Sequence, residues 1–120
     1  MKSEDPVREK SFQFALRIVK LCSYLQNVHK EYVLSKQIIR AGTSIGANLA
    51  EAQYAQSKAD FISKNSIALK EAAETRYWLK LLYGSDFIDE TQYKSVKIDV
   101  DELIKLLTTI VNTSKNNEQP

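Results

Sequence analysis

Apolar residues recur every three or four positions along four stretches of the chain, which is the spacing of one face of an α-helix. The last stretch is the most regular, with apolar positions at Tyr93, Val96, Val100, Leu103, Leu107 and Ile110. Proline occurs only at positions 6 and 120, so the strongest helix breaker is absent between them. The pattern predicts helices over residues 6–28, 31–53, 58–83 and 90–113, followed by a frayed tail over 114–120.

Capping signals support these boundaries. Asp5 stands before Pro6, and an Asp N-cap followed by proline at the first helical position favours a helix start. Ser57 and Asp89 are each followed three residues later by a side chain that can complete a capping box. Gly84 is expected to end the third helix in the left-handed conformation that glycine adopts easily.

Four helices with short connections are expected to pack against their neighbours in antiparallel directions. The length of 120 residues suits one domain, and 43% hydrophobic with 27% charged residues is typical of a globular protein. The sequence therefore predicts an all-α fold, an antiparallel up-down-up-down four-helix bundle, as a single domain over residues 1–120.

The second predicted helix contains residues that a helix interior disfavours. Gly42, Gly46 and Ala50 follow one another at intervals of four, and each glycine costs about 1 kcal/mol relative to alanine. Small residues on one face allow another helix to come close, so these three form a candidate close-packing stripe. Because a second face of the same helix is apolar, we expect this helix to be covered on two sides.

Polar residues interrupt the apolar faces of the second and third predicted helices. Asn48 lies on an apolar face, with Arg40 and Glu51 nearby on the same helix, and Glu74 and Arg76 lie on the third helix. These five residues form a candidate interhelical polar network that would fix the relative positions of the two helices. Ordinary pairing of surface charges is the alternative interpretation.

The sequence offers little for catalysis. A single Cys22 and a single His29 cannot supply a zinc site, and no phosphate-binding glycine loop is present. We therefore predict no catalytic, metal or cofactor site and a non-enzymatic protein. The competing hypothesis is an enzyme whose site combines the carboxylates of Glu51, Glu71 and Glu74.

Since the N-terminal residues do not resemble a signal peptide and no long apolar run occurs, the expected location is the cytoplasm.

Four segments in the second and third predicted helices resemble a known family. They are the second-helix segments Gln37 to Ala41 and Ser44 to Glu51, and the third-helix segments Ser57 to Ile62 and Ile67 to Leu79. These residues resemble the bacterial four-helix-bundle family named for proteins encoded in 23S ribosomal RNA intervening sequences. The resemblance covers nearly the whole chain, with departures at Ala52, where the family usually has glycine, and at Gly46, where proline is frequent.

The resemblance implies a four-helix bundle that often assembles into a ring of five, so a homopentamer is the expected assembly. A related protein, the accessory variability protein of diversity-generating retroelements, is a basic pentamer that works with a reverse transcriptase and nucleic acid. By this analogy, a weak nucleic-acid-binding accessory role with a reverse transcriptase or ribosomal RNA is an alternative to a scaffold role.

The net charge of +2 is small, but residues 1–64 carry +4 and residues 65–120 carry −2. This asymmetry would suit identical chains that meet head to tail. Six residues form the candidate nucleic-acid patch: Lys10, Arg17, Lys20, Lys30, Lys36 and Arg40. We expect binding there to be weak, independent of sequence and sensitive to salt, and an ordinary solvated helix face is the alternative interpretation.

Overall fold

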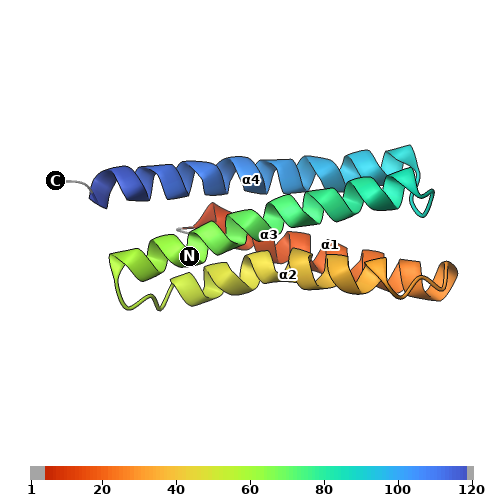
Figure 1. Ribbon diagram of the computed structural model, residues 1–120, viewed down its shortest axis with the longest axis horizontal. Helices are drawn as coiled ribbons and strands as arrows, with labels where there is room; N and C mark the ends of the chain where they lie inside the picture. The colour runs from red at the N-terminus through yellow and green to blue at the C-terminus, as the bar shows by residue number, and fades with distance from the viewer. Residues whose placement is uncertain (1–4, 119–120) are drawn as a thin grey trace.

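Four antiparallel helices pack side by side in the computed structural model, which describes residues 5–118 (Figure 1). They are α1 (Pro6–Val28), α2 (Leu34–Ala52), α3 (Lys58–Gly84) and α4 (Glu90–Glu118). The bundle measures 52 × 26 × 25 Å, and the described part of the chain contains no β-strand. The predicted four-helix bundle is therefore confirmed. None of the helices within residues 5–118 is apolar over a stretch long enough to cross a membrane.

Three of the helix starts are fixed by side chains that the sequence identified. The carboxylate of Asp5 accepts a hydrogen bond from the backbone N–H of Arg8 at 3.3 Å. The hydroxyl of Ser57 accepts from the N–H of Asp60 at 3.0 Å. At the start of α4, Asp89 and Gln92 exchange two hydrogen bonds of 2.8 Å, which is a complete capping box.

The start of α2 differs from the prediction. The helix begins at Leu34 rather than at residue 31, and it ends at Ala52 rather than at residue 53. Glu31 instead folds its carboxylate over the helix end and accepts from the backbone N–H groups of Val33, Leu34 and Ser35, at 3.1, 2.9 and 2.7 Å. Glu31 thus serves as a cap outside the helix, because these N–H groups have no partner within it.

The ends of α3 and α4 also differ from the prediction. Asp86, with φ of 67°, is the left-handed residue after α3, whereas Gly84 has no positive φ and lies inside the helix. The N–H groups of Asp86 and Phe87 bond back to the carbonyls of Tyr83 and Leu82, at 3.1 and 3.0 Å, which is a Schellman motif. The helix is therefore one residue longer than predicted.

The predicted frayed tail is wrong for residues 114–118, because α4 continues as a regular helix to Glu118. No glycine or proline interrupts this segment. Lys115 lies in the last turn, where its positive charge interacts favourably with the negative end of the helix dipole. Residues 119–120, the rest of the predicted tail, lie outside the described residues.

The core contains apolar side chains from all four helices, including Phe14 and Ile18 of α1, Ile38 and Ile45 of α2 and Leu79 of α3. Asn65 and Thr75 are also buried on α3, at 2% and 0% exposed. Each bonds to a backbone carbonyl one turn earlier in its own helix, so neither polar group is left without a partner. These buried polar residues therefore do not join α3 to another helix.

Candidate functional site

The small residues of α2 face α1 of the same chain. A Cβ atom added to Gly42 would lie 2.9 Å from both Cγ1 and Cγ2 of Ile18, which is too close for the present packing. One added to Gly46 would lie 3.3 Å from the hydroxyl of Ser11. The glycines thus let α1 and α2 approach each other closely. Ala50, the third residue of the predicted stripe, is exposed to solvent.

Three large apolar side chains of α1 point into solvent beside the contact between α1 and α2. Phe12, Leu16 and Val19 are 58%, 44% and 48% exposed and lie one turn apart along the helix. We call these three residues the apolar stripe. The apolar arc of α1 is therefore wider than the arc that the bundle covers.

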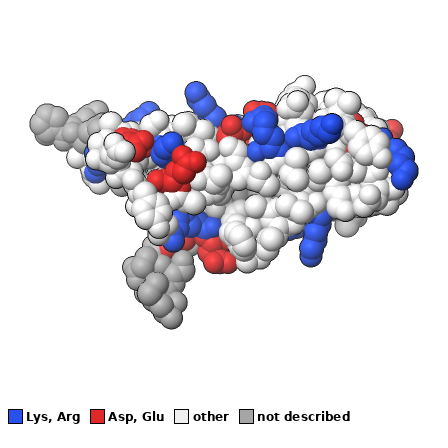
Figure 2. All heavy atoms as spheres, turned by 90° about the horizontal axis from the view of Figure 1, so that it is seen from below, with Lys and Arg blue, Asp and Glu red and all other residues white. Residues whose placement is uncertain are grey.

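A groove of about 420 Å³ runs between α1 and α2 next to the apolar stripe. Its walls combine small and apolar residues with a few polar ones: Arg8, Ser11, Phe12 and Ala15 on the α1 side, and Thr43, Gly46, Ala47, Ala50 and Gln53 on the other. In Figure 2, which views the bundle from the side of α1 and α2, a band without charged residues runs along the middle of the face, with Lys and Arg side chains above and below it. Exposed apolar side chains that lie together beside a groove are typical of a contact with another protein.

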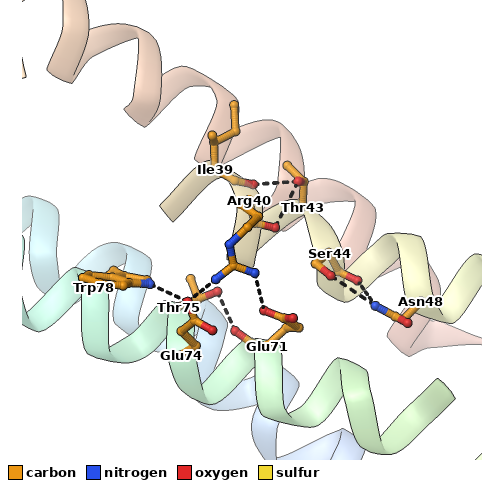
Figure 3. A network of polar contacts seen from close by, with 9 residues as sticks. All are labelled: Ile39, Arg40, Thr43, Ser44, Asn48, Glu71, Glu74, Thr75 and Trp78. Carbon is orange, nitrogen blue, oxygen red and sulfur yellow. Dashed lines mark hydrogen bonds and ion pairs between the residues drawn. The ribbon is translucent and has the colours of Figure 1, made fainter. Parts of the chain in front are cut away.

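Of the predicted interhelical polar network, the structure joins only Arg40 and Glu74 (Figure 3). The guanidinium of Arg40 on α2 donates to the carboxylates of Glu71 and Glu74 on α3, the former at 3.3 Å. The indole N–H of Trp78 donates to the carboxylate of Glu74 at 2.9 Å. A single arginine therefore connects two consecutive turns of α3, and Glu71 and Trp78 belong to this network although the sequence analysis did not include them.

The other predicted members lie elsewhere. The amide of Asn48 donates to the carbonyl and hydroxyl of Ser44 in its own helix, at 2.9 and 3.1 Å (Figure 3). Glu51 pairs with Lys64 at 2.8 Å, and Arg76 pairs with Asp101 of α4 at 3.1 Å. The prediction of one network over five residues is therefore wrong, because Asn48 bonds within its own helix and Glu51 and Arg76 each pair with another charged residue.

Replacing Arg40 with methionine is expected to lower the free energy of unfolding by about 1 kcal/mol or less. The arginine is half exposed, and exposed ion pairs contribute little because water and salt screen them. Urea unfolding of the variant and the wild type would measure the difference. Lys94→Met, which removes an exposed pair with Glu90 within α4, is the matched control. A loss above about 2 kcal/mol for Arg40→Met alone would show that the Arg40 network carries more of the fold than its exposure indicates.

The candidate nucleic-acid patch is largely neutralised by neighbouring acids. Lys10 pairs with Glu102 at 3.2 Å, Arg17 with Asp99 at 2.6 Å, and Arg40 with the two glutamates of α3. Lys30 donates to the backbone carbonyl of Asn27. Within residues 5–118, only Lys20 and Lys36 of the six have no such partner, so the structure does not bring these residues together as one positive surface.

The three carboxylates of the competing enzyme hypothesis do not converge. Glu71 and Glu74 share Arg40, whereas Glu51 forms its own pair with Lys64. Cys22 is buried, and His29 contacts the hydroxyl of Tyr24 at 3.1 Å. Among the described residues, no group of three or more His, Cys, Asp or Glu side chains could hold a metal ion.

Comparison with known proteins agrees with this architecture. The family model described as 23S rRNA-intervening sequence protein matches residues 4–109. A crystal structure of a protein with unknown function from the S23 ribosomal protein family of Bacteroides thetaiotaomicron is 56% identical to this chain. The match covers 88% of this chain and 97% of that one, with a TM-score of 0.87. No curated protein matches. The chain therefore belongs to the 23S rRNA-intervening sequence protein family.

Proposed function

We propose that this protein is a non-enzymatic helical bundle that associates with copies of itself and serves as a scaffold. The observation that carries the proposal is the apolar stripe, because three large apolar side chains are exposed side by side on one helix. Burying such side chains stabilises an assembly by about 25 cal/mol per Å² of apolar surface removed from water. The partner that covers the apolar stripe in this proposal is a second copy of the chain.

Two further features support this proposal. The groove between α1 and α2 lies beside the stripe, and the small residues Ala15, Gly46 and Ala47 in its walls leave room for the side chains of a neighbouring helix. The excess of positive charge in residues 1–64 and of negative charge in residues 65–120 suits a head-to-tail contact, which closes into a ring when the rotation between copies allows it. A ring of five, as the family resemblance implies, is the assembly that we propose.

Replacing Leu16 with glutamate is expected to convert the assembly into monomers. The new charge would lie in the centre of the contact without a partner, whereas in the free bundle it would face water. Size-exclusion chromatography with light scattering would measure the mass. Ile98→Glu is the matched control, since Ile98 is 68% exposed on α4, away from the stripe. An unchanged mass for Leu16→Glu would show that the stripe does not form the contact.

A further inference from the structure

A second groove, between α3 and α4, has a different chemical character from the groove beside the apolar stripe. Its volume is about 410 Å³, and its walls are Ala73, Arg76, Tyr77, Lys80, Tyr93 and Lys97. Three of the six residues are cations and two are tyrosines. Cations interleaved with aromatic rings are typical of surfaces that bind single-stranded nucleic acid.

The charge of this groove is positive after its internal pairs are counted. Arg76 and Lys97 both contact the carboxylate of Asp101, at 3.1 and 2.7 Å. Lys80 has no ion-pair partner among residues 5–118. Two of the three cations thus share one carboxylate and the third has none, in contrast to the α1 surface, where Lys10 and Arg17 each have an acid of their own.

The single carboxylate also holds two of the cations in place. Partial burial opposes the ionisation of Asp101, but hydrogen bonds and charge interactions with Lys97 and Arg76 outweigh it and lower the pKa of the carboxyl group. Asp101 therefore stays ionised at neutral pH and keeps Arg76 of α3 and Lys97 of α4 at the two walls of the groove.

Neighbouring rings hold the two tyrosines. Tyr77 is 57% exposed, and its ring contacts Trp78 edge to face with centroids 5.2 Å apart. Tyr93 stacks on Tyr83, with centroids 4.6 Å apart and 7° between the ring planes. A ring that is already restricted loses little conformational freedom when a base stacks on it.

We propose that the groove between α3 and α4 binds a short segment of single-stranded nucleic acid. Its phosphates would lie against Arg76, Lys80 and Lys97, and its bases would stack on Tyr77 and Tyr93. A duplex fits this surface less well, because its bases are already stacked on one another. An acidic peptide could use the cations but would gain nothing from stacking, and for this reason nucleic acid is the occupant that the combination of groups favours.

The test is fluorescence anisotropy with a labelled oligonucleotide of mixed sequence, as single-stranded RNA, single-stranded DNA and duplex. Each is titrated at about 50 and about 200 mM salt, a range over which phosphate contacts weaken strongly. The wild type is expected to bind both single strands more tightly than the duplex, and to bind less tightly at the higher salt. Equal binding of RNA and DNA, or tighter binding of RNA, would both support the proposal because the two share phosphates and bases.

Tyr77→Leu is expected to weaken binding about tenfold, since stacking on one aromatic ring is lost. Tyr54→Leu is the matched control, because Tyr54 is 83% exposed in the connection between α2 and α3 and lies outside the groove. Both side chains are exposed, so both variants are expected to fold like the wild type, which circular dichroism would check.

Lys80→Gln is expected to weaken binding. It should also reduce the slope of the logarithm of the binding constant against the logarithm of the salt concentration by about 1, which corresponds to the loss of one phosphate contact. Lys36→Gln removes an unpaired charge on α2 and is its control. Three results would overturn the proposal: no binding at low salt, equal losses in the groove variants and their controls, or displacement of the oligonucleotide by polyglutamate as readily as by unlabelled RNA.

Discussion

Gly42→Leu is expected to lower the free energy of unfolding by about 3 kcal/mol, the upper end of the usual range for overpacking a core. Even a Cβ atom at this position would lie 2.9 Å from the side chain of Ile18, which is completely buried and cannot move away. The new side chain must push α1 and α2 apart, and the two helices then lose packing contacts with each other. Thermal and urea unfolding, followed by circular dichroism, would measure the loss.

The matched control is Gly46→Ala on the same face of α2. Its Cβ atom would lie 3.3 Å from the Ser11 hydroxyl, which needs to move by only a few tenths of an ångström. The gain in helix propensity, about 1 kcal/mol, offsets this adjustment, so the stability is expected to stay within about 0.5 kcal/mol of the wild type. Equal stabilities for Gly42→Leu and the wild type would contradict the close packing of α1 on α2.

Glu31→Gln is expected to cost about 2 kcal/mol at neutral pH. The carboxylate accepts from three backbone N–H groups at the start of α2, and hydrogen bonds to a charged acceptor are stronger than those to a neutral amide. This role differs from the prediction, in which Glu31 was the first residue of the helix. Urea unfolding at pH 7 would measure the difference, and Glu9→Gln, an exposed residue in the first turn of α1, is the control.

The contribution of Glu31 should also depend on pH. Partial burial opposes its ionisation, but the hydrogen bonds from Leu34, Ser35 and Val33 outweigh burial and lower the pKa of the carboxyl group in the folded state. The stabilisation is therefore complete above the pKa of the unfolded state, and it is lost as the pH falls through the folded pKa. The stability difference between the wild type and Glu31→Gln should shrink over this acidic range, and a constant difference would contradict the capping role.

Most of the fold could be predicted from the sequence because local rules determine it. The spacing of apolar residues identified all four helices, and the caps at Asp5, Ser57 and Asp89 placed three of the starts. The start of α2 could not be found in this way. Glu31 can continue a helix or cap one from outside, and the choice depends on how the chain turns after α1.

The surfaces were harder to predict than the fold. Periodicity shows that Phe12 and Leu16 lie on an apolar side of a helix, but not how far neighbouring helices cover that side. Similarly, Arg17 and Lys10 form a basic patch in sequence, and only the packing of α4 against α1 brings Asp99 and Glu102 close to them. Charge pairing between helices thus decides which cations remain available, and this depends on distances in the folded protein.

Sedimentation equilibrium of the wild-type protein at micromolar concentration tests self-association most directly. One chain has a mass of 13.7 kDa. If the apolar stripe of α1 is a contact between copies, the measured mass should be a whole multiple of this value, and five times this value for the proposed ring. A mass of 13.7 kDa at every concentration would contradict self-association and leave the stripe without the partner that we propose.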